Sequence, residues 1–237
     1  MRTREVGRVA GLWRYPVKSM AAEPLDEVNV SWHGLAGDRR WAFIREGMER
    51  SGFPWLTIRE RADMASYRPS FSSPDQPDRS PTIVHTPRGA ELDVVDPALA
   101  LELGHGARVI RHDMGVFDTS PLSLVTTQSV TALEGLVGAE LDVRRFRPNL
   151  LVEATDGTPF AEDGWVGGVL RIGSMHMRVD QRDQRCVMVN IDPVSSAREP
   201  AVLRAIGRER EACFGVYGSI VRPGRVTRGD AVMLEMD

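Results

Sequence analysis

Hydrophobic and polar positions alternate in short runs through the first third of the chain, a pattern typical of β-strands. Val9, Gly11, Trp13 and Tyr15 share one parity, and Pro16 ends the run because proline cannot donate to a strand ladder. The same reasoning predicts further strands at 25–30, 38–44, 82–85, 90–95 and 109–111. Short strands separated by glycine turns favour a small barrel or a sandwich.

Helical spacing is confined to a few short stretches. Asp96 and Pro97 have the form of an N-cap and a first helical residue, and Gly104 ends the helix that they open. Apolar residues at helical spacing predict a second helix that ends at Gly138, and Pro200 opens a third that runs to about residue 210. Between them we expect strands at 122–126 and 150–152, a hairpin within 165–179 and a final β unit from residue 214 onward.

The sum is a mostly β protein with a few short helices, built in two closely packed parts. A proline-rich loop is expected over residues 69–87, and the character of the sequence changes around residues 117–121. We place the boundary so that one domain covers residues 1–115 and the other covers residues 116–237.

Composition narrows the classes of function. The 237 residues carry a formal net charge of −3, so the basic footprint of a nucleic-acid-binding protein is absent from the sequence. The sequence holds no apolar run of roughly eighteen residues that could span a membrane, and the first residues lack the apolar stretch of a secretory signal. Two cysteines are too few for a disulfide framework. We therefore expect a protein of the reducing cytoplasm that binds neither nucleic acid nor membrane.

The run that begins at Cys186 carries the first chemical signal. Val187, Val189 and Ile191 alternate as in a half-buried strand that Pro193 ends, so we expect Cys186 where a loop enters a strand. Arginines precede this cysteine, and neighbouring positive charge favours the thiolate that acts as a nucleophile or a soft-metal ligand. A buried structural cysteine is the alternative reading. For the second cysteine, Cys213 beside Phe214, we expect a buried role.

Further clusters could hold an anion. Lys18 offers a point charge and Ser19 a hydroxyl donor, although an isolated lysine is more often a solvated surface residue. Arg39 offers a planar fork suited to phosphate. Other polar groups that could join them are those of Thr119, Ser120, Arg147 and Asn149, of which the first two could equally form a simple turn. Zinc-binding, serine-hydrolase and nucleotide-binding motifs are absent from the sequence.

Together these motifs form an ordered pattern. In chain order they are Tyr15-Pro16-Val17-Lys18-Ser19, Gly37-Asp38-Arg39, Asp118-Thr119-Ser120-Pro121, Phe146-Arg147-Pro148-Asn149, Arg185-Cys186, Asp192-Pro193, Phe214-Gly215-Val216-Tyr217 and Pro223-Gly224 followed by Gly229-Asp230. The pattern resembles the MOSC family, whose fold is shared with the C-terminal part of molybdenum cofactor sulfurases, preceded by its usual N-terminal β-barrel domain. The resemblance covers residues 6 to 234, and the amidoxime-reducing molybdenum proteins are the functional relatives that it suggests.

The resemblance implies a cofactor and its ligands. It implies an N-terminal β-barrel domain packed on a MOSC β-barrel domain that binds molybdenum cofactor, the Mo-molybdopterin, with Cys186 as catalytic residue and metal ligand. The matching cofactor-binding positions are Lys18, Ser19, Arg39, Thr119, Ser120, Arg147, Asn149, Gln184, Arg185 and Cys186. Asp192 is expected to be a structural cap or a group that supports the residues around the cofactor. Family descriptions also include pyridoxal phosphate binding.

Two departures from the family pattern shape the expected function. The chain ends at Asp237 without the ferredoxin-like domain of some bacterial relatives, so we expect electrons from a separate ferredoxin or flavoprotein reductase. The segment 44–66 looks divergent; Thr57 and Arg59 within it could correspond to family positions, but we assign no role to them.

The sequence leaves three functions open. The first is an oxidoreductase that removes oxygen from small N-hydroxylated or N-oxide compounds by oxygen-atom transfer at the molybdenum. The second is a carrier of sulfur or of the cofactor that uses Cys186 as persulfide or ligand. The third is a catalytically silent binding protein that keeps only the fold.

Overall fold

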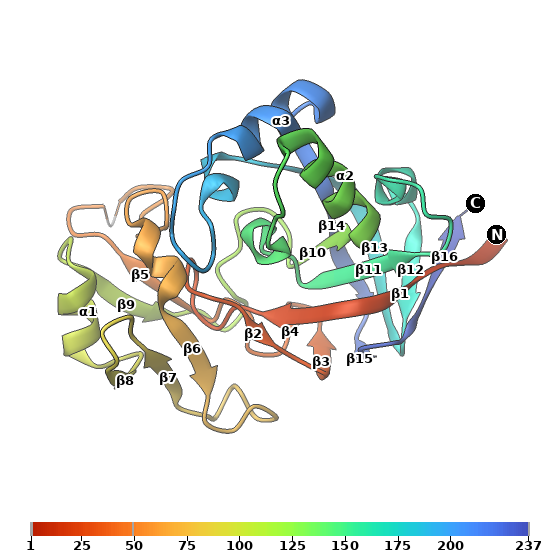
Figure 1. Cartoon of the computed structure of the whole chain (residues 1–237). Helices are drawn as coiled ribbons and strands as arrows, with labels where there is room; N and C mark the ends of the chain where they lie inside the picture. The colour runs from red at the N-terminus through yellow and green to blue at the C-terminus, as the bar shows by residue number, and fades with distance from the viewer. Residues whose placement is uncertain (1, 49, 237) are drawn as a thin grey trace.

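The computed structural model describes residues 2–48 and 50–236, and its largest element is a closed β-barrel (Figure 1). Seven strands form the barrel in the order β11-β10-β14-β13-β12-β16-β1, and β11 closes the ring by pairing with β1. Their bounds are β1 Arg2–Arg14, β10 Leu122–Thr126, β11 Leu150–Ala154, β12 Val169–Ile172, β13 Met175–Gln184, β14 Cys213–Arg222 and β16 Ala231–Met236. Neighbouring strands run antiparallel except for β10 and β11, which are parallel and are connected through helix α2 (Thr127–Val137).

Aliphatic side chains that alternate along the strands fill the barrel. Strand β13 buries every second residue from 175 to 179, as the predicted hairpin requires. In β1 the alternation shifts, so that Val9 and Leu12 are buried whereas Trp13 is only half-buried. The ladder between β1 and β11 is irregular between Val9 and Gly11, and this bulge moves the later residues to the other face. The single parity predicted for residues 9–15 is therefore wrong.

After β1, the N-terminal part folds as small antiparallel sheets. Strand β5 pairs with β9, and β7 pairs with both β6 and β8; these two sheets lie around a second core. Strand β3 pairs with β4 and with the late strand β15, and this sheet packs against the barrel core. The bounds are β2 Glu23–Pro24, β3 Glu27–Ser31, β4 Gly34–Leu35, β5 Trp41–Ile44, β6 Arg68–Phe71, β7 Thr82–His85, β8 Glu91–Asp93, β9 Arg108–Arg111 and β15 Gly224–Thr227. Strand β6 lies partly in the segment that we predicted as a loop. Its Pro69 is tolerated because β6 is an edge strand.

The predicted helices are present and end where their capping residues require. Helix α1 (Pro97–Leu103) begins at Asp96, whose carboxylate accepts from the backbone of Ala98 at 2.8 Å. Helix α2 ends at Gly138, which adopts the left-handed conformation. Helix α3 spans Ala201–Arg210. Helices α2 and α3 lie together on one side of the barrel (Figure 1), over a third core. Single-turn 3₁₀ segments are η1 Ala62–Ser66, η2 Val143–Phe146, η3 Ala161–Trp165 and η4 Val187–Asn190.

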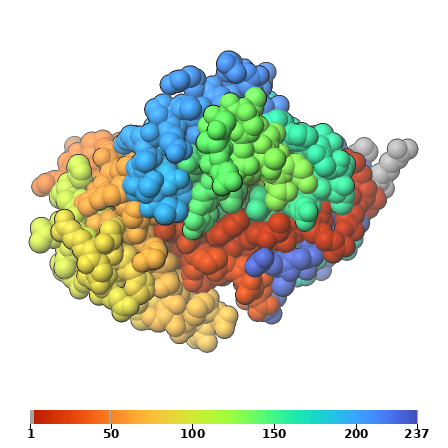
Figure 2. Space-filling view, viewed as in Figure 1, coloured from red at the N-terminus to blue at the C-terminus, as the bar shows by residue number. Residues whose placement is uncertain are grey.

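The mostly β architecture in two packed parts is confirmed, and the segment before α3 joins the parts. In Figure 2 the light-blue residues just before α3 lie against the orange residues that follow β5. Ser196 Oγ lies 3.0 Å from Ser66 Oγ, and Arg198 donates to the backbone carbonyl of Arg59 at 3.1 Å. The boundary after residue 115 stays a prediction, although β1 itself lies in the barrel of the C-terminal part. Within the described ranges, no helix is long and apolar enough to cross a membrane.

Helix α1 offers a matched test of the second core. Leu99 is fully buried, whereas Leu101 on the same helix is 83 % exposed. We expect Leu99→Ala to lower the free energy of unfolding by about 2–5 kcal/mol, since it removes buried methyl groups and leaves a cavity. Leu101→Ala should change it by less than about 0.5 kcal/mol. Urea unfolding of both variants checks this, and equal effects would contradict the placement of α1.

Candidate functional site

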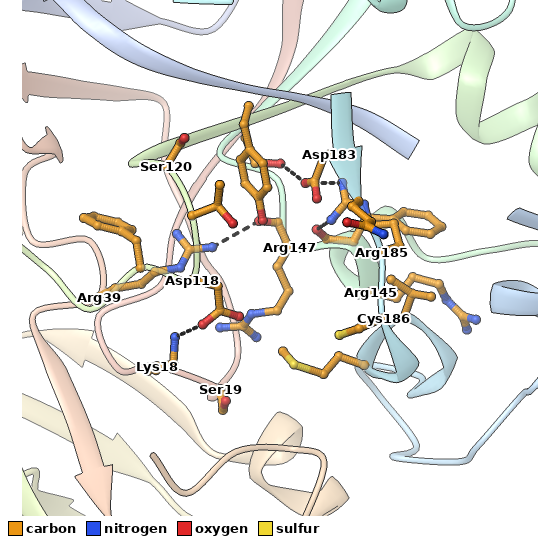
Figure 3. Close-up of a pocket in the computed structure, with 18 of the residues that line it drawn as sticks. Lys18, Ser19, Arg39, Asp118, Ser120, Arg145, Arg147, Asp183, Arg185 and Cys186 are labelled. Carbon is orange, nitrogen blue, oxygen red and sulfur yellow. Dashed lines mark hydrogen bonds and ion pairs between the residues drawn. The ribbon is translucent and has the colours of Figure 1, made fainter. Parts of the chain in front are cut away.

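A cavity of about 380 Å³ lies where the two parts of the chain meet. All ten residues predicted from the sequence as cofactor-binding line it: Lys18, Ser19, Arg39, Thr119, Ser120, Arg147, Asn149, Gln184, Arg185 and Cys186. Figure 3 shows them converging from different segments, with Lys18, Ser19 and Arg39 on one side and Arg185 and Cys186 on the other. Their roles stay predictions, but their convergence on one cavity is a structural fact.

Eleven further residues line the cavity that the sequence did not predict as cofactor-binding. They are Phe53, Arg59, Phe117, Asp118, Ser123, Arg145, Phe146, Asp183, Met188, Val189 and Tyr217. Asp118, Ser123, Phe146, Asp183 and Tyr217 lie in or beside the motifs noted in the sequence, so motif proximity was a usable signal for them. Arg59 and Phe53 lie in the segment judged divergent; Arg59 was noted there as a possible family position without a role, and nothing local in the sequence marks Phe53.

Positive charge dominates the cavity wall. Six lining side chains are cationic and two are acidic. Several buried donors on this wall have no acceptor in the described part of the protein, namely Ser19 Oγ, Arg145 Nε, Arg145 Nη1 and Arg147 Nη2. Buried donors without partners are costly in a native protein, so they indicate an anionic group that belongs in the cavity.

Cys186 lies directly after β13, and the residues that follow it turn instead of extending. The predicted strand at 187–191 is wrong, because these residues form the 3₁₀ turn η4. The reason is the partner strand: Gln184 pairs with Cys213, the first residue of β14, so later residues have no strand to pair with. The backbone instead bonds locally, with Val189 N donating to the carbonyl of Cys186 at 3.2 Å.

The turn fixes how Cys186 is presented. It buries Val189 and leaves Val187 45 % exposed, and the half-buried Cys186 lines the cavity as a free thiol. The reading of Cys186 as a fully buried structural cysteine is therefore wrong. Cys213 is also only half-buried, contrary to expectation, because it lies at the exposed start of β14.

The hydrogen-bond partner of the Cys186 sulfur is an arginine distant in sequence. Arg59 Nη2 lies 3.3 Å from Cys186 Sγ, and the Arg59 guanidinium lies over the ring of Phe53 at 5.1 Å. The adjacent Arg185 instead donates to the backbone carbonyls of Phe146 and Phe214, at 2.7 and 2.8 Å. Arg185 therefore holds the cavity wall together, while Arg59 touches the sulfur.

Lys18 is buried, which excludes the solvated-lysine reading. Its Nζ donates to Asp118 Oδ1 at 2.5 Å and to the carbonyl of Val116 at 3.2 Å. Burial lowers the pKa of Lys18, although Asp118 opposes that effect. Burial favours a raised pKa for Asp118, but Lys18 and nearby arginines outweigh it and hold that pKa below its usual value. Ser19 follows in the left-handed conformation, with φ of 69°, which turns the chain at the cavity wall.

Two arginines flank the buried ring of Tyr15. The guanidinium carbons of Arg39 and Arg147 lie 4.6 and 4.2 Å from the ring centroid. Arg39 is paired with Asp38, whereas within the described residues the Arg147 side chain makes one hydrogen bond, to the carbonyl of Met20 at 2.8 Å. Burial and the neighbouring Arg39 lower the pKa of Arg147 to about 10. Arg147 is thus a half-buried cation that has no carboxylate partner among the described residues, a favourable position for an anion.

The side chain of Asn149 helps to hold the cavity wall together, because its polar atoms already bond to other groups of the protein. Its side chain donates to Asp38 Oδ2 at 3.1 Å and to the carbonyl of Trp13 at 3.2 Å, and it accepts from the backbone of Ser123. Thr119, Ser120 and Gln184 line the cavity, and in the described residues their side chains have no protein hydrogen-bond partner. Asp192 caps a turn by accepting from Ser195, as expected.

Asp183 is the buried carboxyl of the site. It forms an ion pair with Arg185 at 2.7 Å and accepts from Ser123 Oγ at 3.1 Å. Burial raises the pKa of Asp183 to about 6, although Arg185, Ser123 and Tyr217 act in the opposite direction. The cavity therefore contains a carboxyl group that can hold a proton close to neutral pH.

Asp183 also makes stability depend on pH in a defined direction. Because its pKa rises from 3.8 to about 6 on folding, its contribution to stability is full below the unfolded value and is lost as pH rises through about 6. Asp183→Asn removes this loss. We expect the free energy of unfolding of wild type to fall relative to the variant by up to roughly 3 kcal/mol between about pH 4 and pH 7. Urea titrations at several pH values check this, and parallel curves would contradict it.

Comparison with known proteins shows the family to which this chain belongs. The model described as MOSC N-terminal beta barrel domain matches residues 6–92, and the MOSC domain model matches residues 110–233. The chain is 26 % identical to Homo sapiens mitochondrial amidoxime reducing component 2, over 98 % of this chain and 84 % of that protein. It is 24 % identical to Homo sapiens mitochondrial amidoxime-reducing component 1 over the same shares.

One further sequence and one solved structure are also similar to the chain. The chain is 27 % identical to the molybdenum cofactor sulfurase of Drosophila willistoni, over 89 % of this chain but 30 % of the sulfurase. The crystal structure of the YuaD protein from Bacillus subtilis superposes with a TM-score of 0.56 at 13 % identity, covering 98 % of this chain and 97 % of that one, which shows a shared fold. Because the MOSC model alone matches more than half of the residues, the chain belongs to the MOSC domain family.

Proposed function

We propose that the chain is a molybdenum-cofactor-dependent oxidoreductase that reduces small N-hydroxylated or N-oxide compounds. The observation that carries the proposal is the free thiol of Cys186 on the wall of a cationic cavity with unpartnered buried donors. The relatives named as amidoxime reducing components support this reaction class.

The residues present fit such a cofactor. A pterin cofactor carries a phosphate and sulfur donors, and its molybdenum accepts thiolate as a soft ligand. Cys186 would ligate the metal, and the unpartnered groups of Ser19, Arg145 and Arg147 would donate to the anionic parts of the cofactor. When bound, the cofactor supplies the oxygen-atom transfer and the two-electron chemistry.

The residues of this chain would bind the cofactor and hold a proton for the reaction. Removing one oxygen atom from the substrate as water consumes two electrons and two protons. Asp183 lines the cavity with a pKa of about 6, so it can hold one such proton near neutral pH. The electrons would come from a separate ferredoxin or flavoprotein reductase, in the reducing cytoplasm and without nucleic acid or membrane as partner.

A second candidate is a carrier that holds sulfur or the cofactor on Cys186 without oxygen transfer. The similarity to a molybdenum cofactor sulfurase favours it, as does the partial exposure of the thiol. A persulfide on Cys186, seen by intact mass as one added sulfur atom, together with no turnover of N-hydroxylated substrates by the loaded protein, would support this candidate instead.

Cofactor content tests the first proposal. In a host that makes molybdenum cofactor, we expect wild type to carry about one molybdenum and one pterin per chain, since Cys186 supplies the protein ligand. Cys186→Ala should lose most of the molybdenum, and Cys213→Ala should keep it. Elemental analysis and pterin fluorescence measure both, followed by amidoxime reduction with a chemical electron donor. Wild type without molybdenum or pterin would overturn the proposal.

The arginine pair at Tyr15 gives a second test. Arg147→Met removes a buried donor without a carboxylate partner, so we expect pterin retention after dialysis to fall by about tenfold or more, the cost of one charged hydrogen bond. The control is Arg144→Met, since Arg144 is ion-paired with Asp142 and is absent from the cavity lining. Equal losses in both variants would show that net charge, rather than the cavity donor, holds the pterin.

A further inference from the structure

Five of the six cavity cations are already bound by oxygen atoms of the protein. Their acceptors are Asp118 and Val116 for Lys18, Asp38 and Arg147 for Arg39, Asp192 and Glu199 for Arg145, Met20 for Arg147, and Asp183, Phe146 and Phe214 for Arg185. Arg59 is different. Among the described residues, no carboxylate or carbonyl oxygen accepts a hydrogen bond from its side chain, whose one such contact is with Cys186 Sγ.

The carboxylates near Arg59 already interact with other residues. Glu60 accepts from the hydroxyl of Thr57 at 2.7 Å and pairs with Arg45 at 3.3 Å. Asp118 accepts from Lys18 at 2.5 Å. The half-buried Arg59 therefore keeps Nε and Nη1 available for an acceptor from outside the protein.

The backbone holds Arg59 in place from both parts of the chain. Arg59 N donates to Thr57 Oγ1 at 3.2 Å, and the neighbouring Thr57 and Ile58 are buried. From the other part, Arg198 donates to the carbonyl of Arg59. A guanidinium on a fixed backbone, with Phe53 beneath its face, presents its in-plane donors in a defined direction.

We propose that Arg59 and the sulfur of Cys186 together form a subsite for an anionic group of the reactant. A planar fork with open N–H groups recognises a carboxylate or a similar oxyanion, and the 3.3 Å contact places that recognition next to the reactive sulfur. Under the proposed function, on which this extension rests, the preferred substrates are N-oxygenated compounds that also carry a carboxylate.

Alkylation of Cys186 tests the subsite without any cofactor. In both reactions the sulfur displaces iodide from the reagent, but iodoacetate carries a carboxylate and iodoacetamide does not. Because both reagents react with the same thiol, the ratio of the two rates does not depend on the intrinsic reactivity of that thiol. The ratio measures how strongly the protein attracts the carboxylate of iodoacetate. All proteins carry Cys213→Ala, because Cys213 is also half-buried and would react.

We expect the iodoacetate-to-iodoacetamide rate ratio to fall by about tenfold in Arg59→Met, the cost of one charged hydrogen bond. Arg59→Lys should give an intermediate ratio, since lysine keeps the positive charge but lacks the planar guanidinium. Arg144→Met removes an equal charge outside the cavity lining, and its ratio should stay within about twofold of the parent. An unchanged ratio in Arg59→Met, or an equal fall in Arg144→Met, would overturn the subsite.

A second measurement needs no variant at Arg59. Added succinate should slow the reaction of the parent protein with iodoacetamide, and the neutral diamide of succinate should not. Equal effects of the two compounds would overturn the proposal even if Arg59→Met failed to fold.

Failure of this inference is separable from failure of the proposed function. The alkylation ratio is measured on cofactor-free protein, so it can hold or fail whatever the molybdenum content. On loaded protein, a benzamidoxime with a para-carboxylate should have a KM about tenfold below that of its para-carboxamide analogue, and Arg59→Met should remove the difference. Equal KM values in wild type would overturn the substrate preference.

Discussion

An excess of positive charge on fully or partly buried side chains is the constraint around which the site is organised. Taking a guanidinium out of water is costly unless acceptors surround it, and the cavity offers six cations against two carboxyl groups. The fold meets part of this cost with backbone carbonyls, as at Arg185, and with flat aromatic faces, as at Tyr15. The buried donors that find no acceptor among the described residues favour an anionic ligand, so the chemistry that the site suggests follows from what the protein leaves unsatisfied.

The two parts of the chain contribute different things to this cavity. The C-terminal part supplies the thiol and most of the arginines from the ends of barrel strands and short turns. The N-terminal part supplies Lys18, Ser19 and Arg39, and it extends Arg59 to the sulfur across 127 positions of sequence. Neither part alone encloses the sulfur of Cys186, so the cavity depends on the packing of the two parts.

Sequence reasoning was most successful where a local rule governs structure. The caps at Asp96 and Gly138 identified helices, and the switch of apolar parity at Gly173 identified a hairpin. In the structure, the positive φ of Gly173 and its close approach to Arg225 admit no side chain there. It failed at residues 187–191, where alternation was genuine but no partner strand exists. Arg59 could not be found because the contact is set by tertiary packing, and no local pattern encodes which distant arginine reaches a given sulfur.

The closure of the barrel has a consequence for biosynthesis. Strand β1 leaves the ribosome before the other described strands, yet its neighbours in the ring are β11 and β16, and β16 is the last of the described strands to be made. Until β16 is released, β1 and β12 both present unpaired edges that can associate with other chains. Ring closure is thus a late, long-range event. A nascent chain that stalls before its last strand would be a target for chaperones and proteases, whatever the state of its cavity.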